Sequence, residues 1–265
     1  MKEAKTHIVE NRQVAPNTFR MELACPEVAG RARPGQFVMV RTTAELSPLL
    51  RRPLSVHDVT GRGNLRLLYR IVGKGTALLS EMREGAPVSL LGPLGRGFSP
   101  EAAEAHCLVA GGIGVAPLLF LARELIGRNR GRVRLLLGGR SSADILCVPD
   151  FEALGVRVDA ATEDGSLGRR GMVTDLLEEL LEKGEAGAVY ACGPEAMLKV
   201  VAVMARGRKS PCQVSLESHM ACGLGVCLGC AREKPGGGYY HVCKDGPVMD
   251  AERLWPRPNA AACAS

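Results

Sequence analysis

Four cysteines near the carboxyl end of the chain have the spacing of an iron–sulfur site. Cys222, Cys227 and Cys230 follow the pattern Cys-x4-Cys-x2-Cys, and twelve residues separate Cys230 from Cys243. Plant-type [2Fe–2S] proteins hold their cluster with this spacing. Three glycines allow the loop to turn backbone N–H groups toward the sulfur atoms: Gly223, Gly225 and Gly229. The pattern predicts the four cysteines as ligands of a [2Fe–2S] cluster.

Two other interpretations of these cysteines are open from the residues alone. A structural zinc site commonly uses two Cys-x2–4-Cys knuckles of similar shape, whereas here the second half is the single Cys243. The other interpretation is four thiols without a ligand.

A glycine-rich turn near the middle of the chain is suited to binding a dinucleotide. Gly111, Gly112 and Gly114 follow an apolar strand expected over 107–110, and Pro117 fits the first turn of the helix expected next. Glycines let the backbone approach a pyrophosphate, and a helix N-terminus supplies N–H donors and a positive dipole. A tight turn whose glycines serve packing alone is the alternative.

A second apolar strand, expected over 188–191, ends at Cys192, Gly193 and Pro194 before another helix. Ligands bind at the carboxyl ends of the strands in open α/β sheets. The Cys192 thiol is therefore expected either to contact a nicotinamide ring or to pack as a core cysteine.

The run Arg52-Pro53-Leu54-Ser55 could bind a phosphate and a flavin ring. A guanidinium binds a pyrophosphate through two parallel hydrogen bonds, and a hydroxyl a few residues away can face the ring. Thr76 is also predicted as a helix N-cap. Further phosphate and ring contacts are expected from Tyr69, Arg70, Ile71, Gly75 and Thr76.

The elements that must position these groups change along the chain. Residues 1–99 contain short apolar runs separated by Pro and Gly turns, which predict an antiparallel β-barrel with one helix over 76–82. Residues 100–212 alternate strands with helices, one of them over 143–154, which predicts a parallel, doubly wound sheet. Residues 213–265 have few apolar runs, so this part is expected to need a metal centre to fold.

Composition narrows the class of protein further. The chain has 265 residues, enough for more than one core, and a formal net charge of +6. Its arginines are scattered, without the basic stripes and aromatic residues of a nucleic-acid-binding surface. No secretory signal is visible, and the most apolar stretch, 107–122, is too short to span a bilayer. A cytoplasmic protein whose ten cysteines serve as thiols is the expectation.

Taken together, the motifs resemble those of the ferredoxin–NADP reductase superfamily over nearly the whole chain. Within it, the run from His219 to Cys230 most closely resembles the electron-transfer subunits of NAD-dependent (class 1B) dihydroorotate dehydrogenases. The resemblance implies an α+β and α/β multidomain protein. Its parts would be a FAD-binding barrel (1–99), an NAD-binding α/β domain (100–212) and a [2Fe–2S] domain (213–265).

The resemblance also implies roles for the candidate residues. Arg52 would bind the FAD pyrophosphate, and Ser55 would lie near the reactive flavin nitrogen. Cys192 would act with Ser55 as a catalytic group, on the nicotinamide side. Leu54 stands where many reductases of the superfamily have a ring-stacking tyrosine. The remaining FAD contacts would be Pro53, Leu54, Tyr69, Arg70, Ile71, Gly75 and Thr76, and the NAD contacts Gly111, Gly112, Gly114, Pro117, Cys192, Gly193 and Pro194.

The function implied is electron transfer between an FMN-containing dihydroorotate dehydrogenase catalytic subunit and NAD, through the cluster and FAD. The pathway would be pyrimidine (UMP) synthesis, and the assembly a heterotetramer with two copies of each subunit. A reductase subunit of a ferredoxin-dependent transhydrogenase or a sulfide dehydrogenase is the related alternative. A zinc-stabilised nucleotide-binding module without redox activity is the alternative from another class.

The preference for NAD over NADP rests on the resemblance alone. Arg140 could contact a 2′-phosphate. The segment Glu163-Asp164-Gly165-Ser166, with Gly171, either shapes the nucleotide pocket or forms only a turn.

Overall fold

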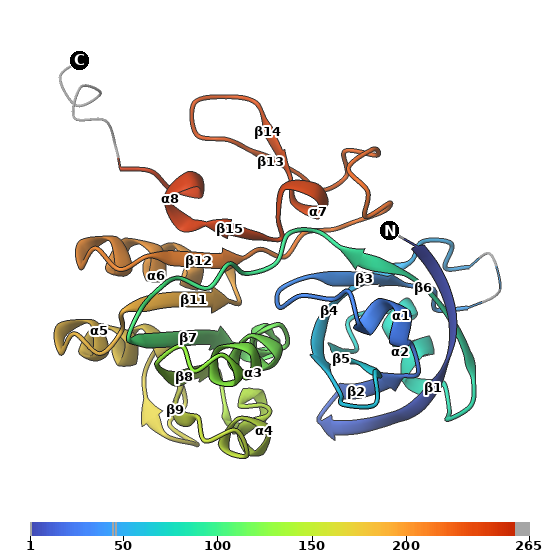
Figure 1. Cartoon of the computed structure of the whole chain (residues 1–265), viewed down its shortest axis with the longest axis horizontal. Helices are drawn as coiled ribbons and strands as arrows, with labels where there is room; N and C mark the ends of the chain where they lie inside the picture. Colours follow the sequence, from blue (N-terminus) through green and yellow to red (C-terminus); the bar gives the residue numbers. More distant parts are fainter. Residues whose placement is uncertain (1, 44, 46, 258–265) are drawn as a thin grey trace.

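The computed structural model describes residues 2–43, 45 and 47–257, which form a barrel, a sheet covered by helices on both faces, and a small carboxyl-terminal segment (Figure 1). The arrangement confirms the predicted fold class. One apolar core fills the barrel and two others cover the opposite faces of the sheet. Among the residues described, no helix is long and apolar enough to cross a membrane.

The barrel is closed by six antiparallel strands in the order β1-β2-β5-β4-β3-β6. Side chains that alternate along the strands fill the barrel: in β6, Val88 and Leu90 are buried in its core, and Ser89 between them is more exposed. The elements of this part are β1 (Lys2–Ala15), β2 (Thr18–Leu23), α1 (Pro26–Ala29), β3 (Phe37–Val40), β4 (Arg52–Val59), β5 (Leu65–Arg70), α2 (Lys74–Glu81) and β6 (Pro87–Leu94).

Helix α2 begins two residues earlier than predicted, so Thr76 is not its N-cap. Gly73 holds that position, and Thr76 lies in the first turn. The Thr76 hydroxyl reaches back to accept hydrogen bonds from the backbone N–H of Val72 (2.9 Å) and Gly73 (3.3 Å). From the first turn of the helix, the Thr76 hydroxyl thus provides an acceptor for two backbone N–H groups that precede the helix.

The sheet has the order β10-β9-β8-β7-β11-β12-β15, and its strands are parallel except β15 at the edge. From β7 the chain builds outward to β10, and then returns to place β11 on the other side of β7. The elements are β7 (Ala105–Gly111), a 3-10 turn (Gly112–Val115), α3 (Leu118–Gly127), β8 (Arg132–Gly139), α4 (Val148–Glu152), β9 (Arg157–Thr162), β10 (Arg169–Arg170), α5 (Val173–Glu182), β11 (Ala188–Cys192), α6 (Glu195–Gly207), β12 (Cys212–Ser215) and β15 (Val248–Asp250).

The helix predicted over 143–154 is wrong in its first half. A 3-10 turn at Ser142–Asp144 is followed by Cys147 in the left-handed region (φ 61°), and α4 starts only at Val148. Pro149 has no N–H to continue a helix from earlier residues. The apolar pattern of this stretch comes from packing on the sheet and not from a long helix.

The carboxyl-terminal segment shares the core of the sheet instead of standing alone. Strand β12 crosses the expected boundary after residue 212, and β15 pairs antiparallel with it. Val242, Met249 and Leu254 are buried in the same apolar cluster as Val201 of α6. Residues 258–265 of the expected domain lie outside the described residues. The remaining elements are β13 (Ala231–Glu233), β14 (Tyr239–His241), α7 (Val242–Asp245) and α8 (Ala251–Leu254).

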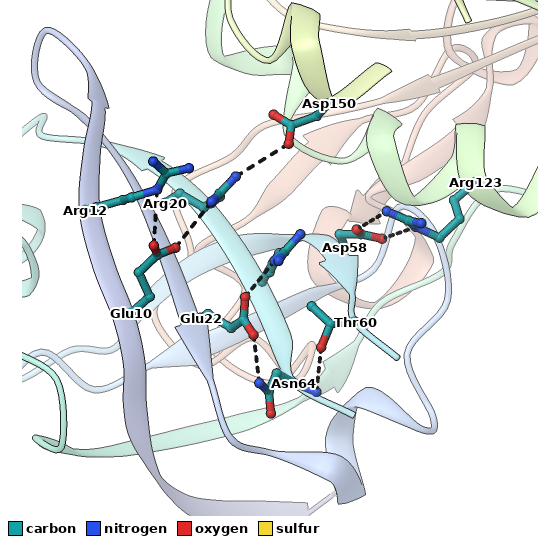
Figure 2. Close-up of polar contacts among 10 residues, drawn as sticks. Glu10, Arg12, Arg20, Glu22, Asp58, Thr60, Asn64, Arg123 and Asp150 are labelled. Carbon is teal, nitrogen blue, oxygen red and sulfur yellow. Dashed lines mark hydrogen bonds and ion pairs between the residues drawn. The ribbon is translucent and has the colours of Figure 1, made fainter. Parts of the chain in front are cut away.

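Ion pairs join the barrel to the sheet and its helices. Figure 2 shows Arg20 of β2 between Glu10 of β1 and Asp150 of α4, at 3.3 and 3.5 Å. In the same view, Asp58 of β4 accepts two hydrogen bonds from Arg123 of α3.

Candidate functional site

A cavity of about 720 Å³ lies where the barrel meets the sheet and the carboxyl-terminal segment. Its volume is in the range of sites for cofactor-sized molecules. The turn before α3 and the segment 216–221 line its far side. The barrel contributes the predicted flavin-binding residues Arg52, Pro53, Leu54, Ser55, Tyr69, Arg70 and Thr76, and the predicted nicotinamide-site residue Pro117 also lines this cavity.

Strands β4 and β5 position these groups at the barrel edge. Tyr69 is buried, stacks on Phe19 at 5.8 Å between ring centroids, and donates a hydrogen bond to Asn11 at 3.0 Å. Burial raises the pKa of the Tyr69 hydroxyl to about 12, so it stays protonated as a donor. Gly75 leaves room for a guanidinium, because a Cβ there would lie 2.7 Å from Cζ of Arg52.

A second cavity, of about 640 Å³, opens at the carboxyl ends of β7 and β11. These two strands flank the point where the strand order reverses, which is where open α/β sheets bind their ligands. Its lining includes Gly111, Gly112, Gly193 and Pro194. The structure thus brings together the two glycine motifs that the sequence predicted for a dinucleotide.

Gly114 and Cys192 lie behind this lining and hold it together. A Cβ on Gly114 would lie 2.5 Å from the carbonyl carbon of Cys192. Cys192 is 3% exposed, and its thiol is hydrogen-bonded to Ser215 of the neighbouring strand. Burial raises the pKa of this thiol, which keeps it neutral. Ile71 also lies outside both linings, and its backbone N–H bonds to the Asn17 carbonyl at 2.8 Å.

The two cavities adjoin, since Arg70, Ile113 and Glu217 line both of them. Arg70 forms an ion pair with Asp144 across this border, at 3.0 Å. The Glu217 side chain keeps access to solvent through the cavities, while the surrounding protein raises the pKa of its carboxyl by disfavouring the charged form. The two cavities therefore share a wall made by these three residues.

Sequence reasoning assigned no cofactor contact to the segment 216–221, although Glu217, His219 and Met220 line the first cavity. The signal was available in part. These residues directly follow β12, at the same carboxyl edge of the sheet as Cys192. The expected domain boundary at 212 separated them from that sheet.

The candidate nucleotide residues divide into two groups. Arg140, Glu163 and Gly171 line the second cavity, together with Asp144. Asp164 instead accepts hydrogen bonds from the backbone and hydroxyl of Ser166, at 2.9 and 2.6 Å, within an exposed turn.

The four predicted cluster ligands lie as two pairs on one loop and α7. The thiols of Cys230 and Cys243 are 3.2 Å apart, and Cys222 is hydrogen-bonded to Cys227. The described residues contain no set of three or more Cys, His, Asp or Glu side chains arranged around one metal position. Two pairs of thiols match a [2Fe–2S] cluster, because each of its two irons takes two cysteine ligands.

Backbone N–H groups on the loop stabilise negative charge on the cysteine sulfur atoms. The N–H of Leu224 points to Cys222 at 3.3 Å, and that of Gly225 points to Cys243 at 3.1 Å. Burial raises the pKa of Cys222, but hydrogen bonds from Leu224, Cys227 and Val226 outweigh it and lower the pKa to about 6. Burial and the adjacent Cys230 raise the pKa of Cys243 to about 12. Two neighbouring buried thiols of this kind both ionise when a metal cation lies beside them. The donor set fits an iron–sulfur cluster.

Comparisons with known proteins match the three parts separately. The oxidoreductase FAD-binding domain matches residues 5–98 and the oxidoreductase NAD-binding domain residues 108–202. The iron–sulfur cluster binding domain of dihydroorotate dehydrogenase B matches residues 217–255.

Relatives align over most of their length. The chain is 43% identical to the electron transfer subunit of dihydroorotate dehydrogenase B (NAD(+)) from Desulforamulus reducens, over 89% of this chain and 92% of that one. The subunit of the same name from Geobacillus thermodenitrificans is 42% identical, over 92% and 95%.

Solved structures agree in fold. A chain of the NADH-dependent reduced ferredoxin-NADP oxidoreductase, studied for flavin-based electron bifurcation, superposes with a TM-score of 0.84 at 31% identity, over 95% of this chain and 90% of that one. A Neisseria gonorrhoeae ferredoxin NADP+ reductase with bound FAD and NADP superposes at 0.67 and 20% identity, over 78% and 92%, which shows the fold alone.

The family predicted from the motifs is therefore confirmed, with FAD, NAD and a [2Fe–2S] cluster as its cofactors. The chain belongs to the family of electron transfer subunits of dihydroorotate dehydrogenase B (NAD(+)), within the flavin- and iron–sulfur-dependent oxidoreductases.

Proposed function

We propose that this chain carries electrons between NAD and an FMN-containing catalytic subunit that oxidises dihydroorotate, in pyrimidine (UMP) synthesis. One observation carries the proposal: the second cavity adjoins the first at Arg70 and Glu217, and the cysteine loop reaches the first cavity through Ala221 and Gly229. The nucleotide site, the flavin site and the cluster loop are thus contiguous in that order.

The cofactors supply the redox chemistry when bound, because flavin exchanges a hydride with nicotinamide and single electrons with an iron–sulfur cluster. The chain's own residues bind these cofactors and orient them. Arg52 supplies a cation for the FAD pyrophosphate, and Ser55 supplies a hydroxyl in the same cavity. Gly111, Gly112 and Gly193 give the dinucleotide access to backbone N–H groups.

The assembly with the catalytic subunit would use the exposed cluster loop, and two copies of each subunit would form the heterotetramer. Cys227 is exposed. This suits the proposal, because a cluster that passes electrons to another protein must lie near the surface. Free thiols and thiolate ligands are typical of a reducing compartment, and we place the subunit in the cytoplasm on that basis.

The test compares Cys227→Ser with Cys25→Ser. Both replace a cysteine by its closest oxygen analogue, but Cys25 precedes helix α1 at its N-cap, where serine is favoured. Cys227→Ser should abolish dihydroorotate-dependent NAD reduction with the catalytic subunit and leave NADH oxidation by a flavin-directed dye within about twofold of wild type. Cys25→Ser should retain both. Retention of both activities by Cys227→Ser, or loss of both in a folded protein, would contradict the proposal.

Within the same site we assign a preference for NAD over NADP to Glu163. Its carboxylate lines the second cavity and would repel a 2′-phosphate, whereas it can accept a hydrogen bond from the ribose 2′-hydroxyl. Glu163→Gln should raise the ratio of NADPH to NADH oxidation by about tenfold. Asp164→Asn, on the exposed turn, is the matched control and should leave the ratio unchanged.

A further inference from the structure

We infer that His57 is a positioning residue for hydride transfer, because it ties the flavin-binding strand β4 to the glycine turn that precedes α3. The inference rests on the proposed function of the two cavities. It concerns the relative placement of the two sites and not the binding of either cofactor.

A β-bulge gives His57 its orientation. Val56 pairs with Leu67, but Asp58 pairs with Arg66, so His57 is an extra residue on β4 relative to β5. Bulges redirect side chains that would otherwise alternate between the two faces of a strand. As a result, two consecutive residues both contact the α3 region: His57 bonds to Ala116, and Asp58 bonds to Arg123.

The His57 contact is buried and specific. Its Nδ1 lies 2.7 Å from the Ala116 carbonyl oxygen, and the side chain is 0% exposed. Since a carbonyl only accepts, Nδ1 carries the hydrogen and donates it. Burial lowers the pKa of His57, which favours this neutral form, and Nε2 faces the Cys147 sulfur at 3.9 Å.

This hydrogen bond joins two elements that line the cavities. On one side, Ser55 is two residues away along β4 and lines the first cavity. On the other, Ala116 also lines the first cavity and ends the turn that contains Gly112 and Ile113, which line the second. The Asp58–Arg123 ion pair holds helix α3 at a second point, and its shorter N–O distance is 2.7 Å. Two points of attachment prevent α3 and its turn from rotating about β4.

The experiment uses two amides that differ in reach. His57→Asn places its amide N–H near the position of Nδ1, whereas His57→Gln carries the same group further from the backbone, toward Nε2. His57→Leu removes the donor. Stopped-flow reduction of the bound flavin by saturating NADH, and by NADH deuterated at C4, measures the hydride step. The dependence of this rate on NADH concentration gives the dissociation constant, and the transient long-wavelength absorbance that precedes reduction reports the nicotinamide–flavin charge-transfer complex.

We expect His57→Leu and His57→Gln to slow the hydride step by about tenfold or more and to weaken the charge-transfer band, because small displacements of reacting groups are costly. The NADH dissociation constant should change by less than about threefold, since the second cavity is intact. His57→Asn should recover most of the rate and the band.

A hydride step unchanged in all three variants would overturn the inference, as would equal losses in the Asn and Gln variants. Failure of all three to fold with FAD would also overturn it, since His57 would then serve the fold and not the placement of the sites. If NADH does not reduce the flavin of the wild-type protein, the proposed function fails first, and the two failures are distinguishable.

Discussion

Gly114 and Cys192 lie in backbone contact, although 77 residues separate them in the chain. A Cβ on Gly114 would lie 2.5 Å from the Cys192 carbonyl carbon and 2.8 Å from Cα of Gly193. The contact joins the turn after β7 to the end of β11 at the point where the strand order reverses. The glycine of the first motif is therefore required for packing against the second, and the shape of the second cavity depends on both.

Gly114→Ala should disrupt the second cavity. The added methyl group overlaps backbone that cannot move freely, which typically costs about 1–3 kcal/mol. We expect NADH oxidation to fall by about tenfold or more, with FAD content unchanged. Gly127→Ala at the end of α3 is the matched control, because a Cβ there meets nothing within 4 Å. Equal activity of the two variants would contradict the role given to this contact.

Arg123→Met should lower the free energy of unfolding more than most substitutions of a surface residue do. Asp58 is fully buried, and its carboxylate accepts hydrogen bonds from Arg123 at 3.0 and 2.7 Å. Removing one partner of such a pair typically costs about 3–5 kcal/mol, and the half-exposed Arg123 places the expectation at the lower end. Denaturant unfolding measures the loss.

Two further variants test the cause of that loss. Arg128→Ala removes an ion pair between an exposed guanidinium and the half-buried Glu124 at the end of the same helix, and should cost less than about 1 kcal/mol. The double variant Asp58→Leu with Arg123→Met removes both charges and should recover part of the stability. If the double variant is no more stable than Arg123→Met, the unpaired buried carboxylate is not the cause.

His57 should make the protein lose stability in mild acid. Burial lowers its pKa in the folded state below the ordinary 6.5, so below that pH the unfolded chain binds a proton that the folded chain does not. The contribution to the free energy of unfolding is present above pH 6.5 and falls as pH decreases, by at most about 1.4 kcal/mol per pH unit. His57→Asn should lack this part of the slope. Urea unfolding of both proteins over this range checks it, and parallel pH profiles would refute it.

The other buried histidine is a control for the same measurement. His106 also has its pKa lowered by burial, at the amino end of β7, and it remains in both proteins. The difference between the two pH profiles therefore isolates His57. His106→Asn should flatten the profile without changing the hydride step, because the residue lies at the opposite end of its strand from the cavities.

Gly223→Ala should slow electron transfer between the flavin and the cluster. Its Cβ would lie 2.7 Å from Cγ of Met39 in β3, so the cysteine loop would move away from the barrel. Reduction of the flavin by NADH should be unchanged, and bleaching of the cluster should become slower in the same stopped-flow trace. Adding Met39→Ala removes the nearest obstructing atom, leaving Cδ1 of Leu94 at 3.1 Å, and should restore much of the cluster rate.

Gly236→Ala separates this effect from backbone strain. Both glycines have positive φ, +72° at Gly223 and +86° at Gly236, but a Cβ on Gly236 meets nothing within 4 Å. Each alanine should cost about 1 kcal/mol of strain. Only Gly223→Ala should affect the cluster rate. A similar effect in both variants would assign the change to strain and not to the contact with Met39.

The motifs could be predicted from the sequence because their chemistry is local. The Cys222–Cys230 spacing, the glycine turn at 111–117 and the run 52–55 each place their groups within one loop or strand, where a few residues decide the geometry. The barrel and the doubly wound sheet were also predictable, since hydrophobic periodicity and turn residues indicate both.

The relations between the motifs depended on tertiary structure. The border of the two cavities at Arg70 and Glu217, and the bulge that turns His57 toward Ala116, require elements far apart in the chain to pack in one register. The same holds for β12 and β15, which bring the cysteine segment onto the sheet. Sequence alone determined which cofactors the chain is built to hold, because binding motifs are short. Only the fold decided how those sites meet, because that geometry arises from long-range packing that no local pattern records.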